Sequence, residues 1–115
     1  MEEIKAYIQR DRVKQVVEAL QREHAPGISI VEIHPVGYGY EPNYFAEQFE
    51  DPFKRYGYLK IVKFEVVCAD QDVGKFLNVI EQECRTGNHG DGLVFVSEVS
   101  DALRIRDGVH GENAL

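Results

Sequence analysis

The chain of 115 residues has an ordinary hydrophobic content of 43% and room for one core, so we expect a single domain over residues 1–115. Its formal net charge of −7 argues against non-specific binding of nucleic acid, whose phosphates require a basic surface. It contains no apolar run of about 18 residues and no signal peptide, which predicts a cytosolic protein without membrane insertion.

The first part of the chain predicts a strand, a helix and a second strand. Residues 3–8 alternate between apolar and polar side chains, as in a strand with one buried face. Apolar residues then recur at helical spacing over residues 13–20, with Asp11 as the expected N-cap and Pro26-Gly27 as the expected stop. Residues 28–33 are mostly β-branched and predict the second strand.

The second part repeats this order. Residues 59–68 alternate and predict a third strand, and an apolar stripe from about Gln71 to Cys84 predicts a helix capped by Asp70 and ended by Thr86-Gly87. Residues 93–99 predict a fourth strand, which residues 103–106 extend or follow. We expect the polar tail after them to be frayed. The order of elements, βαββαβ, is that of an α+β ferredoxin-like fold, with an antiparallel sheet and two helices on one face.

The connection over residues 37–58 is long for two strands that a tight turn could join, and such connections are usually functional or disordered. It holds eight of the twelve Phe and Tyr residues of the chain, whereas disordered linkers are poor in aromatics. These rings either pack the segment on its own oligomer or bind a partner, and the sequence leaves both open. The candidates for partner binding are Tyr40, Tyr44, Phe45, Phe49, Phe53 and Tyr56.

A glycine-rich segment over residues 86–92 is a candidate phosphate loop. Three glycines within six positions let backbone N–H groups approach an anion, although such a segment is more often only a turn. It is not a Walker loop, because no Gly-Lys-Ser/Thr follows. Arg104 and Arg106 alternate about Ile105, so on an extended segment both guanidinium groups would face the same side and suit a polyphosphate. The alternative is a pair of solvated arginines on an edge strand.

Two motifs closely resemble signatures of the PII signal-transduction proteins. They are Thr86-Gly87-x-x-Gly90-Asp91-Gly92-x-Val94-Phe95-Val96 and Arg104-Ile105-Arg106-x-Gly108. The stretches Ile4-Lys5-Ala6-Tyr7-Ile8 and Lys63-Phe64-Glu65-Val66-Val67 are also similar to the family. The resemblance covers residues 3–108.

The resemblance implies a homotrimer that binds ATP or ADP in clefts between subunits and has no catalytic cofactor. It implies that Gly87, Gly90, Asp91 and Gly92 lie around the phosphates, that Arg104 and Arg106 reach in from the neighbouring subunit, that Ser29 lies near the base and that Gly37 lies beside the nucleotide. His89 lies in the same loop, where we expect a ligand contact or a solvated side chain rather than a catalyst. Residues 37–58 would be the effector loop, which docks on a transporter or metabolic enzyme, and residues 103–115 the C-terminal loop and tail.

Three departures from the family pattern carry predictions. Leu93 follows Gly92 where the family has a lysine, and a charge-assisted bond worth about 1.5–3 kcal/mol is lost. This favours ADP or AMP, or an unfamiliar nucleotide, over ATP. The family's glutamine for magnesium and 2-oxoglutarate is absent from residues 37–41, and Ile61 aligns with its lysine for the dicarboxylate. These changes count against 2-oxoglutarate sensing and leave magnesium open. The sequence of residues 37–58 is unlike the family's effector loop, which indicates a PII-like paralogue with its own partner.

Several alternatives remain open. If the protein is a PII-like regulator, it acts in nitrogen metabolism or in a specialised branch such as bicarbonate uptake or carboxysome function. A second class is a small ferredoxin-like enzyme of the acylphosphatase type, and a third is a structural or sensor domain without nucleotide. We expect no enzyme and no metal site, because the four histidines are dispersed and no nucleophile–base pair is evident. Cys68 and Cys84 lack Cys-x-x-Cys spacing and are expected to be buried thiols.

Overall fold

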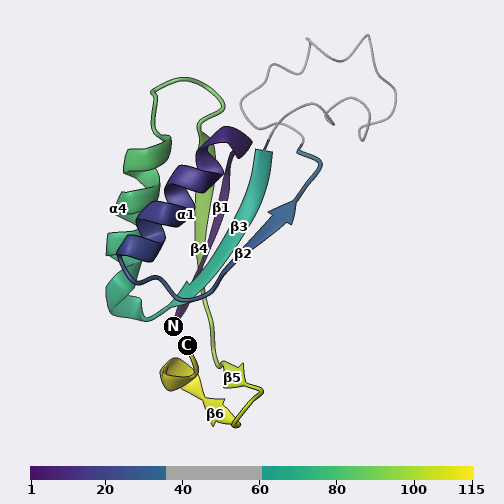
Figure 1. Ribbon diagram of the computed structural model, residues 1–115, viewed down its shortest axis with the longest axis vertical. Helices are drawn as coiled ribbons and strands as arrows, with labels where there is room; N and C mark the ends of the chain where they lie inside the picture. Colours follow the sequence, from purple (N-terminus) through teal and green to yellow (C-terminus); the bar gives the residue numbers. More distant parts are fainter. Residues whose placement is uncertain (36–60) are drawn as a thin grey trace.

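The computed structural model describes residues 1–35 and 61–115 (Figure 1). Four strands form an antiparallel sheet in the order β2-β3-β1-β4. Their bounds are Glu2–Gln9 for β1, Ile28–Glu32 for β2, Ile61–Cys68 for β3 and Gly92–Glu98 for β4. The helices α1 (Val13–Arg22) and α4 (Val73–Cys84) lie on the same face of this sheet (Figure 1). The predicted ferredoxin-like α+β fold is confirmed.

The core lies between that face and the two helices. Ile4, Ala6 and Ile8 of the central strand β1 are buried, as their alternation predicts. Ala6 stands opposite Phe64 on one side and Val94 on the other, so the small side chain at the centre has a large neighbour. The helices contribute buried apolar side chains at helical spacing: Val16, Ala19, Leu20, Phe76, Ile80 and Cys84. Cys68 and Cys84 are both buried free thiols, as predicted.

Both helices begin differently from the prediction. The 3₁₀ turns η1 (Arg10–Arg12) and η2 (Asp70–Asp72) precede them, and neither α-helix has a side-chain cap. Asp11 and Asp70 lie inside these turns, so the prediction that they cap the helices was wrong. The physical reason is that the backbone supplies the acceptor: the N–H of Val13 donates to the carbonyl of Arg10. The Asp70 carboxylate instead lies 2.9 Å from the amino group of Met1.

The first helix also ends before Pro26-Gly27. His24 adopts a left-handed conformation with φ of 61°, and the N–H of Ala25 donates to the carbonyl of Leu20 over 3.0 Å. This bond satisfies a carbonyl of the last turn, and His24 takes the left-handed conformation that a glycine commonly adopts at a helix end. The local backbone, rather than the proline, terminates α1.

The C-terminal segment is ordered, which corrects the prediction of a frayed tail. Leu103–Arg104 (β5) pairs with Val109–His110 (β6), and a 3₁₀ turn η3 follows over Gly111–Ala114. The carboxylate of Asp101 holds the segment together, because it accepts from the N–H groups of Ala102 and Gly111 and contacts His110 Nδ1 at 2.8 Å. Three bonds to one carboxylate explain how a short polar segment keeps a fixed conformation.

No helix in residues 1–35 and 61–115 has the length and apolar character needed to cross a membrane.

Candidate functional site

The loop over residues 86–92 joins α4 to β4 at one end of the sheet (Figure 1). Gly87, Gly90 and Gly92 all have positive φ, at 87°, 94° and 122°. At Gly92 a side chain has no space as well, since a Cβ atom would lie 2.1 Å from the backbone oxygen of Tyr7. The glycines of this motif are therefore required by the backbone itself.

Asp91 organises the loop from within. Its carboxylate accepts hydrogen bonds from the N–H of Thr86 at 2.7 Å, from the N–H of Gly87 at 2.9 Å and from the Thr86 hydroxyl. The hydroxyl bond, followed by the backbone bonds, holds the pKa of Asp91 below its ordinary value. The Asp91 carboxylate thus belongs to the internal hydrogen bonding of the loop.

The middle of the loop leaves donors for a ligand. The backbone N–H groups of His89 and Gly90 have no hydrogen-bond acceptor within the described part of the chain. A hydrogen bond from β1 fixes the loop, because Gln9 Nε2 donates to the carbonyl of Gly90 over 2.7 Å. Arg12 adds positive potential, which further lowers the pKa of Asp91. Consecutive free N–H groups near a cation form a concavity suited to an anion.

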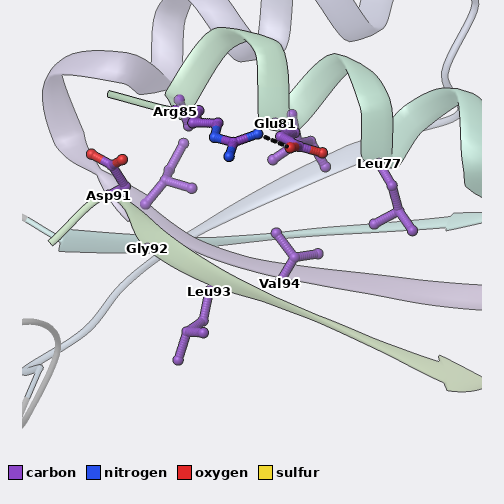
Figure 2. A pocket seen from close by; sticks show the side chains of 10 residues that line it. Leu77, Glu81, Arg85, Asp91, Gly92, Leu93 and Val94 are labelled. Carbon is purple, nitrogen blue, oxygen red and sulfur yellow. Dashed lines mark hydrogen bonds and ion pairs between the residues drawn. The ribbon is translucent and has the colours of Figure 1, made fainter. Parts of the chain in front are cut away.

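A cavity of about 380 Å³ opens beside this loop, between α4 and β4 (Figure 2). Its floor is apolar and includes Ile80 and Cys84, while an ion pair of Arg85 with Glu81 at 2.9 Å lies at its rim. Burial raises the pKa of Cys84 to about 11. Figure 2 shows Val94 directed toward α4 and Leu93 directed away from it. Leu93, which stands where a lysine was expected, therefore lies on the sheet face opposite the helices.

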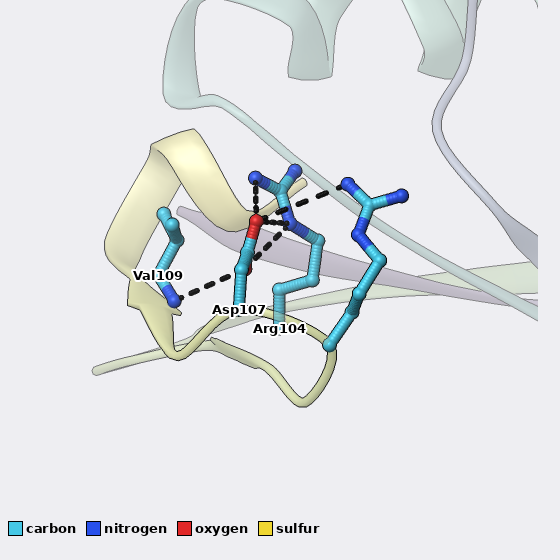
Figure 3. A network of polar contacts seen from close by, with 4 residues as sticks. Arg104, Asp107 and Val109 are labelled. Atoms are coloured by element: carbon cyan, nitrogen blue, oxygen red, sulfur yellow. Dashed lines mark hydrogen bonds and ion pairs between the residues drawn. The ribbon is translucent and has the colours of Figure 1, made fainter.

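Arg104 and Arg106 lie beyond the other end of β4. Arg104 is the last residue of β5 and Arg106 lies in the turn between β5 and β6, and residues 104–108 are here called the arginine turn (Figure 3). The prediction of an extended segment here holds only for Leu103–Arg104. A turn follows, which the N–H of Gly108 closes by donating to the carbonyl of Arg104 over 2.8 Å. Both guanidinium groups still meet at one point, because each contacts the carboxylate of Asp107, at 2.8 Å from Arg104 and 3.8 Å from Arg106.

Sequence reasoning missed Asp107. The signal was an acidic residue directly after the second arginine and before a glycine, which is the composition of a turn that can fold a carboxylate back onto a guanidinium group.

Ser29 lines another hollow, of about 310 Å³. Glu65 and Val67 of β3 form its floor together with Ser29, and Ala114 and Leu115 of the C-terminal segment border it. Polar and apolar residues both line the hollow, as in many sites for small ligands. The contribution of residues 114–115 was also missed, because the tail was expected to be frayed.

The predicted site residues fall into two groups that lie apart. The loop 86–92 precedes β4, whereas the arginine turn follows it, beyond the opposite end of that strand (Figure 1). The seven residues of β4 separate them by about 20 Å at 3.3 Å per residue. A single copy therefore does not bring the loop and the two arginines together around one ligand.

The sheet face opposite the helices is uncovered within the described residues. It carries Leu93 and Phe95 of β4, which are 54% and 53% exposed, and the ring of Tyr7 packs edge-on against Phe95 at 5.8 Å. Ion pairs of Lys63 with Glu65 at 2.9 Å and of Lys5 with Glu3 at 3.3 Å lie on the same face. Exposed apolar rings rimmed by charged groups are typical of a protein interface.

Some predicted residues lie outside the described residues, in the range 36–60. They are Gly37, Tyr40, Tyr44, Phe45, Phe49, Phe53 and Tyr56. In residues 1–35 and 61–115, His, Cys, Asp and Glu side chains form no group of three that could hold a metal ion.

The chain matches the family model described as Nitrogen regulatory protein P-II over residues 1–109. It is 36% identical over 115 residues to a nitrogen regulatory protein P-II of Cereibacter sphaeroides and 34% identical to one of Bradyrhizobium diazoefficiens, with both chains of each pair covered fully. A nitrogen regulatory protein P-II homolog of Arabidopsis thaliana is 31% identical over 111 residues, which span 96% of this chain and 56% of the plant protein. The similarity includes both the loop 86–92 and the two arginines.

Proposed function

The chain belongs to the nitrogen regulatory protein P-II family, and on that premise we propose that it is a signalling regulator that binds an adenine nucleotide between copies of itself. The observation that carries the proposal is the separation of its two anion-receiving features. The loop 86–92 and the arginine turn each suit phosphate oxygens, yet they lie at opposite ends of β4. A ligand that uses both needs a second copy.

The uncovered sheet face supports assembly into the trimer of the family. Leu93 and Phe95 lie at its edge strand, and their exposed area would be removed from water by a neighbouring sheet. Ser29 and Glu65 lie on the same face, in the hollow at the far side of the sheet. In such an assembly, the loop of one subunit would approach the Ser29 hollow and the arginine turn of its neighbour.

The charge of the site favours a nucleotide with few phosphates. A lysine at the position of Leu93 would add a cation next to the loop, whereas this leucine adds none. Arg104 and Arg106 supply positive charge, and Asp107 offsets part of it. We therefore propose ADP or AMP as the preferred ligand over ATP, and we propose that residues 37–58 transmit binding to a partner protein.

The test is a titration of the purified protein with AMP, ADP and ATP in a calorimeter, each with and without magnesium, 2-oxoglutarate and bicarbonate. Mass measurement by light scattering on the same samples reports the number of subunits. We expect a trimer that binds an adenine nucleotide, and the metabolite that alters its affinity assigns the nitrogen or the inorganic-carbon branch. A monomer, or a trimer that binds none of the three nucleotides, would contradict the proposal.

A matched pair of variants locates the site. Arg106→Ala removes a guanidinium that is 79% exposed and is expected to weaken nucleotide binding about tenfold or more, as for a lost bond to a charged group. Arg22→Ala removes a cation from the last turn of α1, which belongs neither to the loop 86–92 nor to the arginine turn, and should leave the affinity unchanged. Equal effects of the two substitutions would mean that only the overall charge matters.

A further inference from the structure

The guanidinium group of Arg104 already holds an anion that the chain itself supplies. Arg104 Nε lies 3.0 and 3.1 Å from the two carboxylate oxygens of Asp107, and Arg104 Nη2 lies 2.8 Å from one of them (Figure 3). This is the forked geometry in which arginine binds a carboxylate or a phosphate. These bonds from Arg104 are the main cause that keeps the pKa of Asp107 below its ordinary value.

The same carboxylate also faces Arg106. Its nearer oxygen lies 3.8 Å from Arg106 Nη2, so one negative charge is shared between the two cations. The pair would present two positive charges to a ligand without Asp107 and presents about one with it. A phosphate that reaches Arg104 must displace the carboxylate or accept a weaker, shared contact.

We propose that Asp107 is a specificity-determining residue, a built-in competitor for Arg104 that lowers the affinity for nucleotides and disfavours those with more phosphates. This inference rests on the proposed function and deepens it, since it names the regulation of that same site. The repulsion between Asp107 and the ligand grows with the number of phosphate charges, because each adds its own Coulomb interaction with the carboxylate. A phosphate therefore makes its full contact with Arg104 only when Asp107 is released.

The turn keeps its shape without the negative charge, which makes the proposal testable. The bonds of Gly108 N–H to the Arg104 carbonyl and of Gly111 N–H to the Ala102 carbonyl involve backbone atoms alone. The Val109 N–H donates to Asp107 Oδ1 at 3.3 Å, and the amide oxygen of an asparagine can accept the same bond. Asp107→Asn therefore removes the charge and retains the local acceptor.

The experiment compares wild type, Asp107→Asn and Glu112→Gln in titrations with AMP, ADP and ATP. Glu112→Gln is the matched control, because it makes the same change of charge in the same segment but contacts Gln71 rather than an arginine. We expect Asp107→Asn to tighten ADP binding about tenfold, AMP less and ATP more, as expected for a partly exposed charged contact. Glu112→Gln should alter each affinity less than about twofold.

The outcomes separate this proposal from the one on which it rests. If wild type binds a nucleotide and Asp107→Asn leaves the affinity unchanged, or lowers it, the competitor role is refuted while the nucleotide site stands. A lowered affinity would make Asp107 a positioning residue for Arg104. If neither protein binds any nucleotide, both proposals fail. Thermal unfolding of each variant, compared with wild type, shows whether the turn and the sheet are intact.

Discussion

Gly92 is the residue at which a single methyl group should damage the structure most. It is the first residue of β4 and pairs with Ile8 of β1. Its φ of 122° is one that side-chain-bearing residues rarely adopt, and a Cβ atom would lie 2.1 Å from the Tyr7 carbonyl oxygen and 3.1 Å from its carbonyl carbon. Both atoms belong to the backbone of the central strand, so a side-chain rotation cannot relieve the clash.

The expected cost of Gly92→Ala has two parts. The backbone conformation costs about 1–3 kcal/mol for a residue with a side chain. Moving the start of β4 away from Tyr7 loses at least one backbone hydrogen bond, which adds about 0.5–1.5 kcal/mol. The sum is about 1.5–4.5 kcal/mol of the free energy of unfolding, a large share of the roughly 5–15 kcal/mol typical of a domain.

Urea denaturation followed by far-UV circular dichroism measures this cost. Gly87→Ala is the matched control, since Gly87 also has a positive φ but no atom lies within 4 Å of its Cβ position. It should lose only about 1–2 kcal/mol, the cost of the left-handed conformation. If Gly92→Ala is no less stable than Gly87→Ala, the close approach of Gly92 to Tyr7 does not exist in solution.

Three further predictions each concern a single residue. Folding lowers the pKa of Asp91 from 3.8, so the ionised carboxylate stabilises the fold above that value, and this stabilisation is lost as the pH falls through the folded pKa. The difference in free energy of unfolding between wild type and Asp91→Asn should therefore be largest near neutral pH and shrink in acid. A difference that stays constant with pH would contradict this prediction. At pH 8, a thiol with a pKa of about 11, as for Cys84, is about a hundredfold less ionised than a thiol with the ordinary pKa of 9.0. Mass spectrometry should therefore find no rapid alkylation by iodoacetamide in the native protein, and two labels, on Cys68 and Cys84, in urea. Gly74→Ala in α4 meets no atom within 4 Å and should raise the free energy of unfolding by about 0.4–1 kcal/mol, whereas a loss would show that the helix needs that glycine.

The sheet and its helices could be predicted because their signals are periodic. Ile4, Ala6 and Ile8 alternate and are all buried, and the stripe from Phe76 to Cys84 faces the core as its spacing requires. Such patterns report the large hydrophobic contribution to folding, which tertiary structure seldom overrides.

The helix ends and the C-terminal segment could not be predicted in the same way. Whether Asp11 caps a helix depends on whether the chain makes a 3₁₀ turn first, which is a small difference in backbone energy. The tail is fixed by one carboxylate, Asp101, whose partners lie one, nine and ten residues away. Polar bonds of this kind have no period in the sequence.

The candidate site was predicted by resemblance more than by chemistry. The glycines of the loop 86–92 carry a physical signal, and their positive φ values bear out the need for glycine. Arg104 and Arg106 lie at a different end of the sheet from the loop because β4 stands between them in the sequence, and the predicted order of elements already implied this separation. The contact of the Asp107 carboxylate with Arg104 was found only in the structure.

The carboxylates of Asp91 and Asp107 are expected to have opposite effects on nucleotide binding. Each carboxylate occupies donors that an anion would otherwise bind, the N–H groups of Thr86 and Gly87 in one case and the Arg104 guanidinium in the other. Asp91 bonds hold a loop whose N–H groups at His89 and Gly90 remain available, so its removal should unfold the cradle and weaken nucleotide binding. Asp107 bonds Arg104 and the Val109 N–H in a turn that the bond from the Gly108 N–H to the Arg104 carbonyl also closes, so Asp107→Asn should release a cation and strengthen binding. Two Asp→Asn substitutions of equal charge thus have opposite expected signs, which a purely electrostatic account of the site would not give.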